Sequence, residues 1–234
     1  MSASKDTDTS PKRLCWASLL MPPVVMGVGM FGAGSVLMLQ GVAQEAIGEA
    51  ISAWVFPLIP GLYGLMVGMN FLLLRRSGQG LRALLWGRRV PVRELALGVC
   101  VGLGLAVINQ LGSFPLIERL NGPEGGENFD PALNMLSVPE LVVTVIFAVL
   151  AEDLLYRGYS LFSLREHHGP FVALVATALA YALFNLGQGP WMFTWAIVLG
   201  LAWSGLALWR GCVAAVLVGH LVVSMAPRCF QAMG

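Results

Sequence analysis

Three charged residues lie together where the surrounding chain is almost entirely apolar. Glu152 and Asp153 come just after the apolar run 141–150, and Arg157 follows four residues after Asp153. A charged side chain at the centre of a membrane costs roughly 2.5–3.5 kcal/mol on insertion scales, so it needs a partner and marks a candidate functional site. Since residues four apart share one face of a helix, Asp153 and Arg157 can form an ion pair there.

Glu152 lies on a different side of the same helix, about 100° from Asp153. We therefore expect Arg157 to neutralise Asp153, while Glu152 faces another helix or a wet cavity. One alternative is a purely structural ion pair that fixes helix packing. Another is a charge relay in a small transporter or channel subunit. The additional carboxylate favours a functional site over a structural pair.

Two later apolar segments carry further polar side chains. Phe184 and Gln188 are four residues apart, on one face at the end of their segment, and His220 lies inside an apolar run with Ser224 one turn later. Each has a structural interpretation by itself, as a packed histidine, a turn residue or a serine bonded to its own helix. Together with the charged stretch, they give three helices whose polar groups could converge on one pocket.

No metal or cofactor site is predicted. The four cysteines show no motif spacing, so neither a disulfide framework nor a zinc site is expected. The adjacent His167 and His168 lie in a polar turn, which favours a solvated pair over a metal site. No cluster of cysteine, histidine and acidic residues has the spacing of metal ligands.

Composition places the chain in a membrane. Of its 234 residues, 57% are hydrophobic and 12% are charged, with a mean hydropathy of +0.75. Soluble domains carry roughly 25% charged residues. Apolar runs of about 20 residues can cross a bilayer as helices. We therefore predict an all-α, polytopic transmembrane helix bundle in contact with membrane lipid. The net charge of +1 gives no reason to expect nucleic-acid binding.

The apolar runs predict about seven spans. They fall near 16–39, 51–74, 95–111, 137–163, 171–187, 191–208 and 212–226, and Pro22 and Pro23 are expected to break the first. Residues 1–13 are predicted to be a polar cytoplasmic tail, and 14–234 a single integral membrane domain. No internal repeat is visible, which weakens the transporter alternative.

Charge bias predicts the orientation. The loop 75–93 is rich in arginine, whereas the charged residues of the loop 118–130 are mostly acidic. The loop 75–93 should therefore be cytoplasmic and the loop 118–130 outside. This places the amino terminus in the cytoplasm. The segment 81–86 between the arginines is expected to lie in the membrane interface.

Local motifs predict two details of packing. Gly98 and Gly102 form a small-residue face that lets another helix approach closely. Ser137 and Glu140 have the spacing of a capping box at the start of a helix.

The charged stretch also resembles a family motif. Glu152-Asp153-Leu154-Leu155-Tyr156-Arg157-Gly158 is similar to the Glu-Glu-x-x-x-Arg motif of the CAAX-protease and bacteriocin-processing family. Phe184 matches the phenylalanine of the family's second motif, Phe-x-x-x-His, and His220 matches the histidine of the third. The resemblance covers a protease-like core at 139–226.

This resemblance implies an intramembrane peptidase of glutamate type. It implies that Glu152 activates water, that His220 binds the oxyanion, and that Asp153 and Arg157 hold the helix in register. The substrate would be a membrane-associated or prenylated peptide, and the location a bacterial inner membrane.

Three positions depart from the family pattern. Asp153 replaces the second glutamate, Gln188 replaces the histidine of the second motif, and Ser224 replaces the final asparagine. Ser224 can still donate a hydrogen bond, whereas the Gln188 amide cannot transfer a proton near neutral pH. The alternative function is therefore a catalytically impaired pseudoprotease that acts as a membrane scaffold or binding protein.

Overall fold

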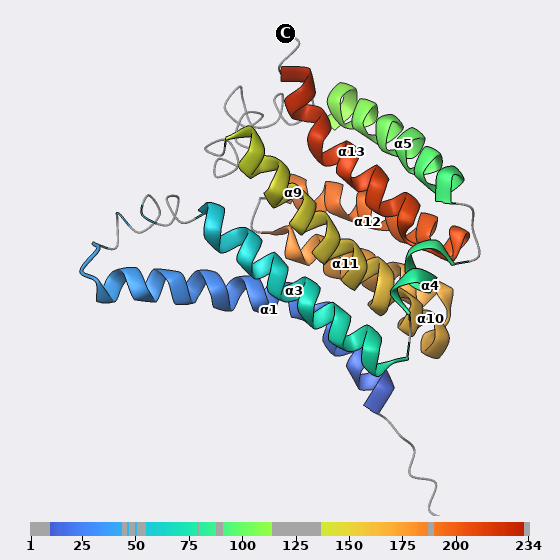
Figure 1. Ribbon diagram of the computed structural model, residues 1–234, viewed down its shortest axis with the longest axis horizontal. Coiled ribbons are helices and arrows are strands. Elements are labelled where there is room, and N and C mark those ends of the chain that lie inside the picture. Colours follow the sequence, from blue (N-terminus) through green and yellow to red (C-terminus); the bar gives the residue numbers. More distant parts are fainter. Residues whose placement is uncertain are drawn as a thin grey trace, which may run out of the picture.

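The computed structural model describes residues 10–43, 46, 50, 55–78, 80–87, 91–113, 137–186 and 190–231, and within these ranges the protein is all-α (Figure 1). In chain order the elements are α1 (Ser10–Leu39), α3 (Val55–Arg76), α4 (Leu81–Trp86), α5 (Pro91–Ile108), the π-helix η2 (Asn109–Ser113), α9 (Val138–Glu152), the π-helix η3 (Asp153–Ser160), α10 (Leu161–His168), α11 (Pro170–Phe184), α12 (Pro190–Arg210) and α13 (Ala214–Gln231). The predicted helix bundle is confirmed.

Four helical segments in the described part of the chain are long and apolar enough to cross a membrane. They are Arg13–Leu39, Leu58–Arg76, Pro91–Leu111 and Met192–Arg210. The segments Pro170–Phe184 and Ala214–Ala226 are apolar but shorter. A bilayer core about 30 Å thick is spanned by about 20 helical residues. The chain is therefore a polytopic integral membrane protein.

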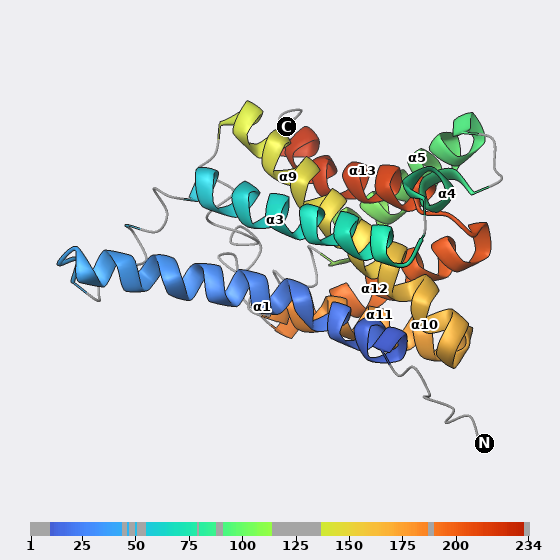
Figure 2. The same ribbon diagram turned by 60° about the horizontal axis from the view of Figure 1, so that its bottom comes forward.

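The first helix differs from its prediction. α1 continues without interruption through Pro22 and Pro23, so the expected break is wrong. Proline removes one backbone donor, but membrane helices tolerate it because neighbouring groups and small local adjustments satisfy the freed carbonyl. α1 begins at Ser10, so the last residues of the predicted tail are helical. Its carboxyl-terminal half projects beyond the bundle (Figure 2), where Phe31 and Leu39 are exposed as lipid-facing side chains would be.

A long helix through the bundle centre carries the charged stretch. It starts at α9, where the predicted capping box is confirmed: Glu140 accepts hydrogen bonds from the backbone N–H and the hydroxyl of Ser137, at 2.8 and 2.7 Å. Helical structure then continues through η3 and α10 to His168, beyond the predicted end at Ser163. Gly169 stops it, because its φ of 86° is a conformation that favours glycine.

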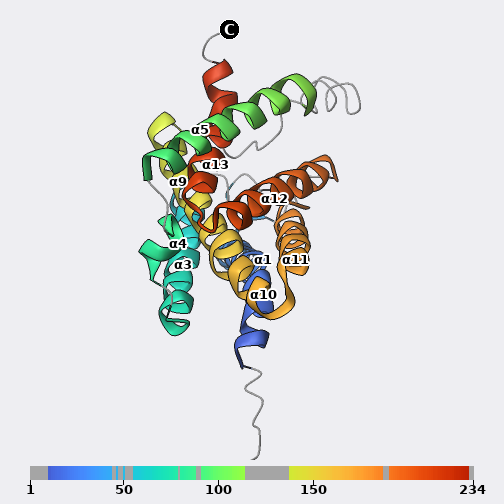
Figure 3. The ribbon, with the colours of Figure 1, turned by 90° about the vertical axis from the view of Figure 1, so that its right-hand side faces the viewer.

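The helix α5 packs directly along α13 (Figures 1 and 3). A Cβ added at Gly98 would lie 2.5 Å from the carbonyl oxygen of Ala215, and one at Gly102 would lie 2.6 Å from that of Gly219. The predicted small-residue face is thus confirmed, and its partner is the helix that carries His220. This packing holds α13 in place on the side that faces α5.

The short helix α4 has the predicted bounds but is held against the bundle. The Leu84 carbonyl accepts the backbone N–H of Val213 at 3.1 Å. The Leu84 side chain lies 3.0 Å from where a Cβ of Gly158 would stand, so α4 covers the glycine that follows the charged motif. α3 packs on α9, and α11 packs on α12, which leaves η3 enclosed by helices.

Candidate active site

The charged motif lies in a π-helix. All eight residues of η3 are buried, with Asp153 and Arg157 fully excluded from solvent. π-helical segments are rare and occur frequently at functional sites. The wider π turn begins directly after Glu152, so the site is built where the regular α9 helix ends.

Asp153 lies at the centre of the polar cluster. Its Oδ1 accepts a hydrogen bond from Arg157 Nη1 at 3.0 Å, which confirms the predicted ion pair. Its Oδ2 lies 3.2 Å from His220 Nδ1, on α13. One carboxylate therefore connects residues that are 67 positions apart in the chain. Sequence reasoning placed Asp153 in a pair with the arginine and missed its contact with the histidine.

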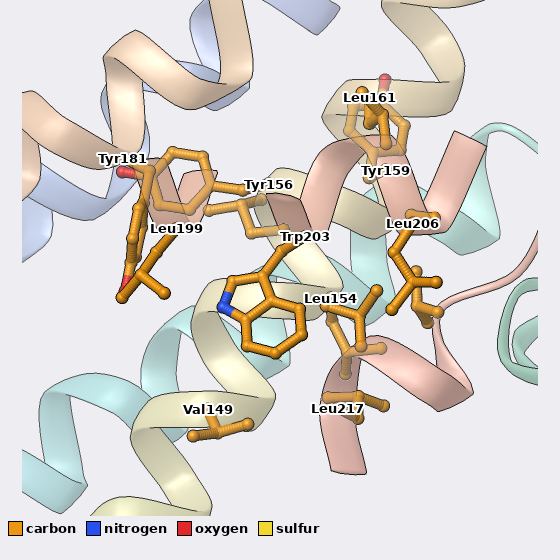
Figure 4. Packing of buried hydrophobic residues seen from close by; sticks show 14 of the residues in the cluster. Val149, Leu154, Tyr156, Tyr159, Leu161, Tyr181, Leu199, Trp203, Leu206 and Leu217 are labelled. Atoms are coloured by element: carbon orange, nitrogen blue, oxygen red, sulfur yellow. The ribbon is translucent and has the colours of Figure 1, made fainter. Parts of the chain in front are cut away.

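Aromatic side chains enclose His220. Trp203 stacks on its ring with centroids 6.0 Å apart, and the Tyr181 hydroxyl lies 3.4 Å from Nε2. The guanidinium of Arg157 lies over the Tyr181 ring, 4.0 Å from its centroid, in a cation–π contact. Figure 4 shows the nitrogen edge of Trp203 on the side of Tyr181 and Leu199. These aromatic rings restrict the orientation of the Arg157 guanidinium and of the His220 ring.

Glu152 reaches the same cluster from a different side. It is buried, and its Oε1 accepts a hydrogen bond from the Tyr63 hydroxyl of α3 at 3.2 Å. His220, Arg157 and Asp153 all interact with it electrostatically. The expectation that Glu152 faces another helix is confirmed, and that helix is α3.

Several buried donors around the cluster have no hydrogen-bond partner among the residues that the structure describes. They are Trp203 Nε1, the Tyr156 hydroxyl, and Nε and Nη2 of Arg157. Buried polar groups in folded proteins are nearly always paired with protein or water, so each unpaired group calls for an explanation. Indole and guanidinium nitrogens only donate. The cluster is therefore suited to an acceptor-rich group such as a peptide carbonyl.

The remaining predicted residues have different positions. Phe184 packs on Tyr156 with ring centroids 6.5 Å apart, so the end of α11 reaches the site. Ser224 is half-buried, one turn after His220 on α13. Gln188 lies outside the described residues, and its predicted role is not tested.

Three residues of the site were missed by sequence reasoning: Tyr63, Tyr181 and Trp203. A sequence signal existed for Trp203, because most tryptophans of this chain fall near span ends whereas this one lies inside an apolar run. Tyr181 lies one helical turn before Phe184, on the same face. Tyr63 gave no signal, because a tyrosine near a span end is ordinary.

The histidine pair lies exposed at the end of α10, as expected, and His168 has one further contact. His168 Nε2 accepts the Trp16 indole N–H at 3.0 Å, which links the start of α1 to the end of α10. Within the described ranges, no group of three or more histidine, cysteine or acidic side chains could hold a metal ion.

A family comparison agrees with these residues. Residues 134–226 match the model of the family described as type II CAAX prenyl endopeptidase Rce1-like. No curated protein and no solved structure matches the chain. The matched region contains the charged motif, Phe184 and His220, and it leaves α1 to α5 outside. Residues 134–226 of this helical membrane protein therefore match the Rce1-like CAAX-protease family, as the motif resemblance predicted.

Proposed function

We propose that this protein is an intramembrane endopeptidase that cleaves a membrane-associated or prenylated peptide. The observation that carries the proposal is a buried Glu152 beside the Asp153–His220 contact, within a domain of a peptidase family. A carboxylate held in an apolar enclosure is well placed to take a proton from water. The surrounding donors suit the carbonyl that this water would attack.

Each side chain then has a role that follows from its contacts. Glu152 takes a proton from water, which attacks the scissile carbonyl carbon. His220, with Ser224 one turn away, faces the negative charge that develops on the carbonyl oxygen. Asp153 orients His220, and Arg157 offsets the charge of Asp153. These roles require no metal and no cofactor.

A second candidate function is supported by position 188. Glutamine there cannot transfer a proton, and a general acid or base contributes typically 10²–10⁴-fold to a rate. A chain that lacks this group could keep the pocket and bind membrane peptides without cleaving them. In that pseudoprotease, Gln188→His should create peptidase activity that depends on Glu152.

We further propose seven spans across a bacterial inner membrane, with a short cytoplasmic tail (1–13) and one membrane domain (14–234). The high arginine content of residues 75–93 supports a cytoplasmic location for that loop. A cysteine introduced at Arg82 should react with an impermeant reagent from the cytoplasmic face. Reaction from the outer face alone would reverse the orientation.

The proposed activity can be tested on the full chain reconstituted in liposomes. A library of lipid-anchored and prenylated peptides would be offered to the parent, to Glu152→Gln and to Glu166→Gln. Glu166 is an exposed glutamate at the end of α10 and controls for the change of charge. Cleavage by the parent and the control, but not by Glu152→Gln, supports the proposal. Activity that survives Glu152→Gln removes Glu152 from the mechanism. A folded parent that binds peptides without cleaving them favours the pseudoprotease.

A further inference from the structure

The charges of the buried cluster do not balance unless one of its groups takes up an extra proton. Glu152 and Asp153 are two carboxylates, and among the described residues Arg157 is the one permanent cation that acts on both. A neutral His220 would leave one uncompensated negative charge among apolar helices, which is costly. An extra proton on His220 or on Glu152 removes this imbalance. Imidazole is intrinsically a stronger base than a carboxylate, which favours His220.

The contacts of the ring also accommodate a cation. Nδ1 lies 3.2 Å from a carboxylate oxygen of Asp153, and Nε2 lies 3.4 Å from the Tyr181 hydroxyl, which can accept a hydrogen bond. Trp203 stacks on the ring with its planes 28° apart, and the face of an indole attracts a cation. Among the described residues, Asp153 and Tyr181 contact the ring, Glu152 interacts with it electrostatically, and Arg157 reaches it through Asp153.

A donor role for Nε2 leads to the same protonation state. Because Nδ1–H is used by Asp153, the neutral ring would carry a lone pair on Nε2 and could not donate there. Only the imidazolium donates from both nitrogens. If His220 faces the oxyanion, it therefore also carries a transferable proton at the reaction centre.

We propose that His220, held as an imidazolium by Asp153, is the proton donor to the leaving nitrogen and supplies the proton transfer that Gln188 cannot provide. This inference rests on the proposed peptidase function. Water loses a proton to Glu152 and forms a bond to the carbonyl carbon. When the carbon–nitrogen bond breaks, its electron pair goes to nitrogen, which takes the Nε2 proton. His220 is then neutral and Glu152 protonated. Transfer of that proton from Glu152 to His220 restores both.

The protonation state can be measured without any activity. His167→Gln and His168→Gln leave His220 as the only histidine, since the chain has 3. Nitrogen NMR of the full chain, labelled on histidine side chains, should show both ring nitrogens protonated at neutral pH. Glu152→Gln removes the surplus negative charge and should leave a neutral ring with its proton on Nδ1. Glu94→Gln, in a separate ion pair, should leave the imidazolium unchanged. A neutral His220 in the background protein would overturn the inference. If Glu152→Gln does not fold, Asp153→Asn makes the same test.

The catalytic role needs a test that separates proton donation from oxyanion binding. An alkoxide leaves without assistance far more readily than an amine, whereas an oxyanion donor serves an ester and a peptide equally. His220→Gln should therefore lower kcat for a cleaved peptide by about 10²–10⁴-fold, and much less for the matching ester. Equal losses for both substrates would show that His220 only binds the oxyanion. A parent that cleaves neither substrate defeats the proposed function and this catalytic role together, while the NMR result still decides the charge of His220.

Discussion

Two buried ion pairs in this molecule have opposite characters. On α5, the fully buried Glu94 meets Arg210 of α12 through Nη2 and through Nε, the latter at 3.1 Å. Cys212 Sγ lies 3.8 Å from the same carboxylate. This pair joins the start of α5 to the end of α12, and Cys212 lies in the turn that leads to α13. In the η3 cluster, by contrast, two carboxylates lie beside one arginine, a histidine and several donors that have no partner among the described residues.

The difference shows which features of a buried ion pair indicate function. A buried pair by itself is weak evidence even for stability, because desolvation offsets much of the attraction. In the Glu94 pair, an acid lies directly against a base, which holds it through two nitrogens. The η3 cluster has one more carboxylate than arginine, and several of its buried donors have no acceptor among the described residues. Imbalance, rather than burial, distinguishes the candidate active site.

The largest expected effect comes from replacing one buried glutamate with glutamine, either in the η3 cluster or in the Glu94 pair. Glu152→Gln should lower kcat by about 10²–10⁴-fold while the protein still folds, because its carboxylate is in excess. Glu94→Gln should mainly lower the thermal unfolding temperature, because the ion pair between Glu94 and Arg210 is lost. Peptide cleavage and thermal unfolding in detergent would be measured for both. Loss of activity per folded molecule in Glu94→Gln alone would contradict this separation.

The second expected effect concerns the two arginines. Arg157→Ala leaves Asp153 buried without its cation, and breaking such a pair costs about 3–5 kcal/mol. Arg210→Ala should cost less, because Arg210 is 19% exposed and water can replace part of its contact. The free energies of unfolding of the two variants would be compared in the same detergent. Arg157→Ala should also be less stable than Glu152→Gln, and a parent-like Arg157→Ala beside an unstable Glu152→Gln would show that the partners are wrongly assigned.

Sequence reasoning found the features that follow a regular helical period. The pairing of Asp153 with Arg157 and the small-residue face of α5 depend on positions within one helix, and both are confirmed. The family match confirms the resemblance, which rested on motif order. The π-helix was missed, because η3 satisfies an α-helical pattern equally well.

Contacts between helices were the part that the sequence did not predict. His220 reaches Asp153 only because α13 packs against α9, directly before η3, and no period within either helix contains that information. The same holds for Tyr63, which lies 89 positions from Glu152. The break expected at Pro22 was wrong, since a backbone preference in water was applied to a helix in lipid.

A third, smaller effect tests how the α5 region supports the site. A Cβ at Gly102 would lie 2.6 Å from the Gly219 carbonyl oxygen, and Gly219 precedes His220. Gly102→Ala should therefore separate α5 from α13 and cost about 1–3 kcal/mol, as overpacking does. Gly104→Ala is the matched control, because nothing lies within 4 Å of its added Cβ. Thermal unfolding that is equal for the two variants would show that the close approach does not matter.

The smallest expected effect concerns Tyr63, which links the N-terminal helix α3 to the charged cluster of the matched region 134–226. It lies on α3, outside the matched region 134–226, yet its hydroxyl donates to Glu152 at 3.2 Å. Tyr63→Phe removes this hydrogen bond and keeps the ring, so roughly 1 kcal/mol is lost, or about a fivefold decrease in kcat. KM should not change, because the hydroxyl orients the base and does not touch the peptide. Tyr159→Phe makes the same chemical change on η3 and should leave kcat as in the parent. If Tyr63→Phe raises KM and leaves kcat unchanged, the hydroxyl serves substrate binding. If it changes neither, the N-terminal helices only enclose the site and do not position its carboxylate.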